Sequence, residues 1–309
     1  MIKVGDFINN PEIQNMKQES LYALSKEKHI QKFLKDNHID SSLMDEYWVE
    51  LLDYNDDFHM CEGCTSLQNC PKDNQGMKKN IVYRDGEILL ELESCPFGKA
   101  LEKKRLLLEK FVVTNVNDEV LLSDLSSLSI VKDMKKNYAK MSLNTRKTVE
   151  EVLGYMSHPT DKGFFLHGDM ETGKTSLLAG LMNALAKKGK EIGFIHFPTY
   201  LIDLKASFSS GDNEYAMERL MKVDYLLLDG IGEENITPWS RDEILLTILS
   251  YRLLNHLPTF FTSMYGYKDL ENVYTIKKSD NGDKIRAKTI IKKMKALSNE
   301  IMLDEGKMK

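Results

Sequence analysis

The sequence predicts an α/β fold in which a domain built around a central parallel sheet follows a smaller helical module. From about residue 138 onward, short apolar runs alternate with longer segments of helical periodicity, a pattern typical of βαβ units. A glycine-rich loop follows the first of these runs. All four cysteines, by contrast, lie in the N-terminal half. We therefore expect two domains, residues 1–100 and 138–309, with a linker over residues 101–137.

The N-terminal half begins with apolar residues at helical spacing. They fall in two segments within residues 11–58, which predicts two or three helices. The run IVYRDGEILLELE has apolar residues on both sides of Asp85-Gly86, and an Asp-Gly pair favours a tight hairpin turn. Residues 101–137 follow no single period, so we expect a linker with a short helix there.

The cysteines predict a structural zinc site. Cys61, Cys64, Cys70 and Cys95 supply four thiolates, the number that a closed tetrahedral Zn²⁺ site requires. In a reducing compartment such clustering favours metal binding over disulfides. A small module with little hydrophobic core often depends on a structural metal ion for its stability. His59 in place of one thiol, or free or redox-active thiols, are the alternatives. A catalytic zinc is not expected, because four thiolates leave no position open for water.

The C-terminal half alternates between expected strands and expected helices. The apolar runs that predict strands are FFLHG, GFIHF, YLLLD, TFFTS and EIMLD. Helical periodicity is found near residues 173–188, 213–222, 239–256 and 286–298. This order predicts a parallel sheet covered by helices.

Composition places the chain among globular proteins. It has 309 residues, of which 42% are apolar and 29% are charged. No run of residues is long and apolar enough for a signal peptide or a membrane span, so we expect a cytoplasmic protein. The formal net charge of −5 neither indicates nor excludes binding to nucleic acid.

The glycine-rich loop predicts a phosphate site for ATP. GDMETGKT fits the P-loop pattern G-x-x-x-x-G-K-[ST] between an expected strand and an expected helix, the setting that the motif requires. Its glycines permit backbone N–H groups to point at phosphate oxygens, and the helix N-terminus adds positive potential. Lys174 would reach the β- and γ-phosphates, and the hydroxyl of Thr175 would bind Mg²⁺. The alternative is an ordinary glycine turn. The residues expected to line the nucleotide are Gly168, Asp169, Met170, Glu171, Thr172, Gly173, Lys174, Thr175 and Ser176.

A second acidic position completes the expected magnesium site. The apolar run Tyr225–Asp229 ends in a carboxylate, as the strand that partners a P-loop should. We expect Asp229 to hold Mg²⁺ through a bound water molecule. The alternative is that Asp229 only ends a strand, because Asp is common in turns.

The motifs of the C-terminal half resemble those of a known family. The stretch from YLLLDGIGEE through TPWSRDEILLTILSYRLLNHLPTFFTS, with the P-loop before it and RAKTIIKKMKAL after it, resembles the bacterial AAA+ replicative helicase loaders of the DnaI type. The resemblance implies an AAA+ fold for the C-terminal half and a helicase-binding role for residues 1–100. It also implies that the chain acts in the primosome, placing the replicative helicase on single-stranded DNA, with self-assembly on the helicase ring as a further expectation.

Several positions depart from the pattern of this family. The second acid, which follows the magnesium-binding Asp and orients water, is replaced by Gly230. The Asn that senses the γ-phosphate is replaced by Met264, which has no comparable hydrogen-bonding group. Thr289 and Lys293 stand where the family has arginines, and Lys293 is at the position of the arginine finger.

These departures predict ATP binding with weak hydrolysis. An arginine finger alone contributes about 10³ to 10⁵ in rate. Lys174 and Asp229 remain as the residues expected to take part in catalysis, and Glu233 or Glu234 could replace the missing acid.

The resemblance also suggests where DNA binds. LIDLKASFSSGDNEY resembles a loader-specific helix beside the single-stranded DNA path. Lys205 would contact phosphate and Phe208 would stack on a base, although Phe208 could instead pack beneath its own loop. The lysine-rich stretches 132–140 and 277–288 would either add affinity for DNA or form solvated faces.

The sequence is compatible with three functions. The leading one is a helicase loader. The second is a hydrolysis-deficient homologue that acts as a decoy or inhibitor of helicase loading. The third, an ATPase that assists transposition, shares the C-terminal motifs, but the cysteine-rich N-terminal half argues against it.

Overall fold

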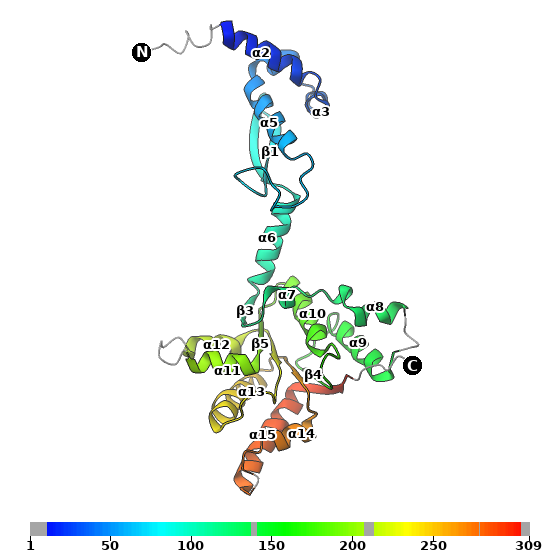
Figure 1. The fold of residues 1–309 in the computed structure, drawn as a ribbon, viewed down its shortest axis with the longest axis vertical. Coiled ribbons are helices and arrows are strands. Elements are labelled where there is room, and N and C mark those ends of the chain that lie inside the picture. Colours follow the sequence, from blue (N-terminus) through cyan, green and yellow to red (C-terminus); the bar gives the residue numbers. More distant parts are fainter. Residues whose placement is uncertain (1–10, 137–140, 207–212, 278, 304–309) are drawn as a thin grey trace. The chain divides into compact units, whose positions relative to one another are not determined.

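The computed structural model describes residues 11–136, 141–206, 213–277 and 279–303. The chain divides into two compact units, Met1–Lys104 and Arg105–Lys309 (Figure 1). Among the described helices, none is both long enough and apolar enough to cross a bilayer.

The first unit combines helices with one β-hairpin. Four helices lie between Pro11 and Met60, where the sequence predicted two or three. They are α2 (Pro11–Leu24), α3 (Lys28–Asp36), α4 (Ser41–Glu46) and α5 (Trp48–Met60). Strands β1 (Met77–Arg84) and β2 (Glu87–Ser94) pair antiparallel. Asp85 and Gly86 both have positive φ, 53° and 90°, as a two-residue hairpin turn requires.

A small apolar core holds the helices of this unit against the hairpin. Leu24, Ile30 and Leu51 come from the helices, and Ile81 and Ile88 come from the strands. Each of these side chains is at most 7% exposed. The core is therefore compact, and it depends on the hairpin for two of its members.

The segment expected to be a linker is instead structured. Helix α6 (Pro96–Leu108) is followed by strand β3 (Phe111–Thr114), helix α7 (Asp118–Leu121), the 3₁₀ turn η1 (Leu125–Ser127) and helix α8 (Ser129–Lys136). Strand β3 pairs with β5 and becomes an edge strand of the main sheet. Its four residues are too few to show a clear period in the sequence.

The second unit is built on a six-stranded parallel sheet, which confirms the predicted α/β fold class. The strand order is β3-β5-β6-β7-β4-β8, and all the pairings are parallel. The last five strands in sequence are β4 (Gly163–His167), β5 (Ile192–His196), β6 (Tyr225–Asp229), β7 (Thr259–Ser263) and β8 (Ser298–Met302). Strand β7 lies between β4, which leads into the P-loop, and β6, which ends in Asp229.

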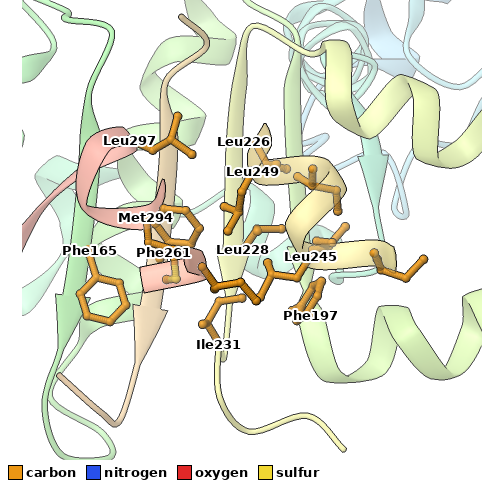
Figure 2. Packing of buried hydrophobic residues seen from close by; sticks show 14 of the residues in the cluster. Phe165, Phe197, Leu226, Leu228, Ile231, Leu245, Leu249, Phe261, Met294 and Leu297 are labelled. Carbon is orange, nitrogen blue, oxygen red and sulfur yellow. The ribbon is translucent and has the colours of Figure 1, made fainter. Parts of the chain in front are cut away.

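Helices cover both faces of this sheet. They are α9 (Leu143–Tyr155), α10 (Lys174–Lys187), α11 (Phe197–Ala206), α12 (Asn213–Lys222), the π-helical turn η4 (Trp239–Leu245), α13 (Leu246–Leu254), α14 (Tyr267–Val273) and α15 (Asn281–Leu297). Leu226 and Leu228 of β6 face a core formed with α11, α13 and α15, whereas Leu227 faces a core formed with α9 and α10. Figure 2 shows the first of these cores. Strands buried on both faces explain the uninterrupted apolar runs in the sequence.

Candidate nucleotide-binding site

The P-loop connects β4 to α10, as the sequence predicted for this motif. Gly168 and Gly173 have positive φ, 145° and 89°. A Cβ added at Gly168 would lie 2.1 Å from the carbonyl oxygen of Leu303. The N–H of Leu303 donates to the carbonyl oxygen of His167 at 2.7 Å, so the chain after β8 closes directly onto the loop. Only glycine fits at position 168, both for its backbone angle and for this close approach.

Lys174 lies inside the loop. Its ammonium donates to the carbonyl oxygens of Gly168 at 2.9 Å and of Asp169 at 2.6 Å. The residue is only 8% exposed. Burial lowers the pKa of Lys174, and the negative charges of Glu233 and Asp229 oppose that effect. A buried, partly desolvated ammonium at this place is suited to an anionic ligand.

The remaining loop residues are placed around this ammonium. The hydroxyl of Thr172 donates to the carbonyl oxygen of Asp169 at 3.0 Å and stabilises the turn. Four of the predicted lining residues are exposed, namely Asp169, Met170, Glu171 and Ser176. Three of these residues precede α10, and Ser176 lies in its first turn.

The two predicted magnesium ligands lie together. The hydroxyl of Thr175 donates to Asp229 Oδ1 at 2.6 Å, although the two residues are 54 positions apart in the chain. A hydroxyl and a carboxylate are oxygen ligands of the type that Mg²⁺ prefers. Their arrangement therefore fits a magnesium ion held between the P-loop and the end of β6.

Thr262 is a site residue that sequence reasoning missed. Its hydroxyl also donates to Asp229 Oδ1 at 2.6 Å and accepts the N–H of Gly230 at 3.0 Å. The residue is 3% exposed and lies near the end of β7. Thr262 thus orients the carboxylate of Asp229, a predicted magnesium ligand, from the neighbouring strand. The only signal in the sequence was its place near the end of an apolar strand.

The departures from the loader pattern are found in three places. Gly230 has φ 78°, and a Cβ added there would lie 3.2 Å from Nε2 of His196. Met264 follows β7 and is 38% exposed. Thr289 and Lys293 lie on α15, where the hydroxyl of Thr289 donates to a backbone carbonyl of the preceding turn.

The two glutamates beyond β6 have different surroundings. Glu234 is 8% exposed and accepts the N–H of Gly232 at 2.7 Å and the hydroxyl of Tyr274 at 2.7 Å. Burial raises the pKa of Glu234. Glu233 is exposed. Its carboxylate accepts no hydrogen bond from the part of the chain that the structure describes.

A buried arginine connects this loop to α15. Arg241 is 1% exposed and donates to the carbonyl oxygen of Tyr274 at 2.8 Å. It also forms ion pairs with Asp242 at 2.7 Å and with Asp283 at 2.9 Å. The hydrogen bond from Arg241 lowers the pKa of Asp283 to about 2. The sequence showed no sign of this network, which holds the loop after β6 to the C-terminal helix.

Lys205, the predicted DNA-binding lysine, lies near the end of α11 beside a cavity of about 530 Å³. The cavity is also lined by Leu201, Trp239 and Glu233. Phe208, the predicted stacking residue, lies outside the described residues.

The predicted zinc site of the first unit is not supported. Among the described residues, no group of three or more His, Cys, Asp or Glu side chains is placed to hold a metal ion. Two of the thiols contact the backbone: Cys64 Sγ donates to the carbonyl oxygen of Ser66 at 3.5 Å, and Cys95 Sγ accepts the N–H of Gly98 at 3.4 Å. His59 pairs with Glu62 at 2.8 Å. The zinc-stabilised character of this unit is therefore not shown by its geometry.

Comparison with known proteins finds similarity to a replicative helicase loader. Over 307 residues the chain is 25% identical to the replicative helicase loader DnaI of Bacillus subtilis (strain 168), covering 95% of this chain and 93% of that protein. The predicted resemblance to DnaI-type helicase loaders is confirmed. A scan against family models finds no match.

Two solved structures resemble this chain in fold and sequence. A protein from Streptococcus pyogenes serotype M3 described as a primosome component is 28% identical, with a TM-score of 0.52, and the match covers 65% of this chain and 96% of that one. A crystal structure of DnaI is 27% identical, with a TM-score of 0.51, covering 62% and 93% of the two chains. Both comparisons agree with the loader resemblance in sequence.

Proposed function

We propose that this chain is a helicase loader that binds Mg²⁺-ATP at its P-loop. The observation that carries the proposal is the meeting of Thr175 with Asp229 beside the buried ammonium of Lys174. The similarity to DnaI over nearly the whole chain supports the loader role, and with it a place in DNA replication and in the cytoplasm.

Different residues of the site would bind the phosphates and the magnesium ion of the nucleotide. Backbone N–H groups of the P-loop and Lys174 bind the phosphates, while Thr175 and Asp229 hold the magnesium ion. The ion neutralises charge on the phosphates when it is bound. Because position 230 has no acid and Met264 cannot donate a hydrogen bond to phosphate, we expect hydrolysis to be slow.

The two units would bind different partners. We propose that the first unit binds the replicative helicase, and it exposes large apolar side chains, including Tyr22 at 65%, Met60 at 51% and Leu92 at 55%. The second unit would bind single-stranded DNA near Lys205, with assembly of several copies on the helicase ring. Lys205 supplies a positive charge that would pair with a backbone phosphate.

A second candidate function is an inhibitory homologue of a loader. The observation that favours it is the crowding at Gly230, where the ring of His196 stands 3.2 Å from an added Cβ. A chain that binds ATP and helicase without hydrolysis would occupy the helicase without completing loading.

Two measurements test these proposals. ATP affinity, measured with a fluorescent ATP analogue and Mg²⁺, should be lost in Lys174→Ala and retained in Lys188→Ala, which changes a lysine at the far end of α10.

The loading of a replicative helicase onto circular single-stranded DNA separates the two functions. Stimulation by this chain supports a loader, and inhibition of a competent loader mixed with it supports the inhibitor. If neither Lys174→Ala nor the parent chain binds ATP, the nucleotide proposal is wrong.

Zinc in the first unit remains a prediction from the cysteine spacing alone. The thiol of Cys70 has a lowered pKa because the backbone N–H of Lys72 lies near it, and a thiolate is the form that binds zinc. Metal analysis of the purified protein checks this prediction. Less than half an equivalent of zinc per chain would remove it.

A further inference from the structure

Helix α15 concentrates positive charge in a chain whose net charge is negative. Its 17 residues include six basic side chains and one acid, Asp283, whereas the whole chain has a formal net charge of −5. The carboxylate of Asp283 is buried and is paired with the buried guanidinium of Arg241. The exposed surface of α15 therefore carries basic side chains and no acid.

Three of the basic residues lie on one face of the helix. Lys284, Lys288 and Lys292 are exposed and follow one another at intervals of four residues, so their Cβ atoms are about 5–6 Å apart. None of their side chains forms an ion pair or a hydrogen bond with the described residues, including the acids Asp269 and Glu271 of the neighbouring helix α14. Like charges at this interval destabilise a helix. A bound polyanion would remove that repulsion.

A nucleic-acid backbone fits this face better than a protein surface does. The cores of protein–protein interfaces are depleted in lysine and enriched in aromatic residues. On α15, all of whose residues the structure describes, the one large apolar side chain that is exposed is Ile285. A lysine ammonium is a compact point charge that pairs with a phosphate whatever the base. Helix α15 also covers the same face of the sheet as α11, which carries Lys205, and Figure 1 shows its N-terminal end extending away from the sheet.

We propose that Lys284, Lys288 and Lys292 bind backbone phosphates of single-stranded DNA, as a contact separate from Lys205. This inference rests on the proposed binding of single-stranded DNA by the second unit, and it adds a contact that does not depend on base sequence. Each lysine that neutralises a phosphate releases a counterion, so the contact weakens as the salt concentration rises.

The double variant Lys288→Gln/Lys292→Gln tests the proposal in the full chain, because glutamine has a high helix propensity and removes the charge. Lys103→Gln/Lys104→Gln is the matched control, since it removes the same charge from two exposed lysines of α6. Binding of labelled oligo-dT is measured by fluorescence anisotropy at several NaCl concentrations. Loss of two phosphate contacts should lower the steepness of log K against log[NaCl] by about 1.4. Affinity at 0.1 M NaCl should then fall about 25-fold, because this difference acts over the one decade of salt up to 1 M.

Two further arms separate charge from other causes. Lys288→Arg/Lys292→Arg keeps the charge and should keep the parental salt dependence, and an oligonucleotide of mixed sequence should give the same result as oligo-dT. An unchanged salt dependence in the glutamine variant, an equal loss in the control, or a loss that persists at 1 M NaCl would overturn the proposal. So would a glutamine variant that binds DNA as the parent does but loses affinity for a replicative helicase, which would assign this face to a protein partner. A parent chain that binds no single-stranded DNA would instead contradict the proposed function.

Discussion

Thr262→Val is the most informative change at the proposed magnesium site. The hydroxyl of Thr262 makes two hydrogen bonds, donating to Asp229 Oδ1 at 2.6 Å and accepting from the N–H of Gly230 at 3.0 Å. Valine has nearly the same shape as threonine but has no hydroxyl. The substitution therefore removes the two hydrogen bonds while it leaves the packing of β7 against its neighbours almost unchanged.

The expected losses follow from these contacts. The N–H of Gly230 would lose its partner in a buried environment, which costs about 1–3 kcal/mol of stability. If Thr175 and Asp229 hold Mg²⁺, as proposed, Thr262 would be the hydroxyl that orients the carboxylate of Asp229. Loss of such a supporting hydrogen bond typically weakens metal binding 10- to 100-fold, which equals about 1.4–2.8 kcal/mol. We expect the Mg²⁺ concentration needed for half-maximal ATP binding to rise by that factor.

The assay is a Mg²⁺ titration of fluorescent ATP-analogue binding, with urea unfolding measured on the same samples. Thr262→Ser is the matched control, because it keeps the hydroxyl and loses only a methyl group. It should keep most of the Mg²⁺ affinity. An unchanged Mg²⁺ midpoint in Thr262→Val, with the unfolding curve shifted as expected, would refute the assignment of Thr262 to the magnesium site.

Three other predictions follow from neighbouring contacts. Gly168→Ala should abolish ATP-analogue binding, because its Cβ would lie 2.1 Å from the carbonyl oxygen of Leu303, and wild-type affinity would contradict this. Tyr274→Phe should lower the unfolding free energy by about 1–3 kcal/mol, measured in urea, because Glu234 loses a hydroxyl donor while buried. Burial lowers the pKa of His167 below 6.5, so the folded state binds fewer protons than the unfolded state, and stability should fall as the pH drops through 6.5. His167→Gln should flatten that part of the pH dependence of unfolding.

Several features of the second unit could be predicted because their causes are local in the chain. Strands β4, β6 and β7 are buried on both faces of the sheet, so each is a mainly apolar run in the sequence. The P-loop could be recognised because its glycines, lysine and threonine act within one turn between a strand and a helix. Strand β3 could not be recognised, because its four residues are too few to show a clear period in the sequence.

Other features depended on contacts that spacing does not describe. The four cysteines suggested a zinc site by number and interval. The structure gives two of these thiols backbone partners, and within the described residues it brings no three potential metal ligands together. Glu233 and Glu234 are adjacent and chemically identical, yet one is exposed and the other is buried against Tyr274.

The sequence by itself determined the phosphate loop and the run of buried strands, because each is a property of residue type at a short interval. Only the tertiary structure decided that Thr262 supports Asp229, that His196 fills the space beside Gly230 and that Glu233 is the exposed carboxylate. Parallel strands place residues side by side that are 30 or more positions apart in the chain, as Thr262 and Asp229 are, at a separation of 33. No interval along the sequence indicates which strand will be the neighbour.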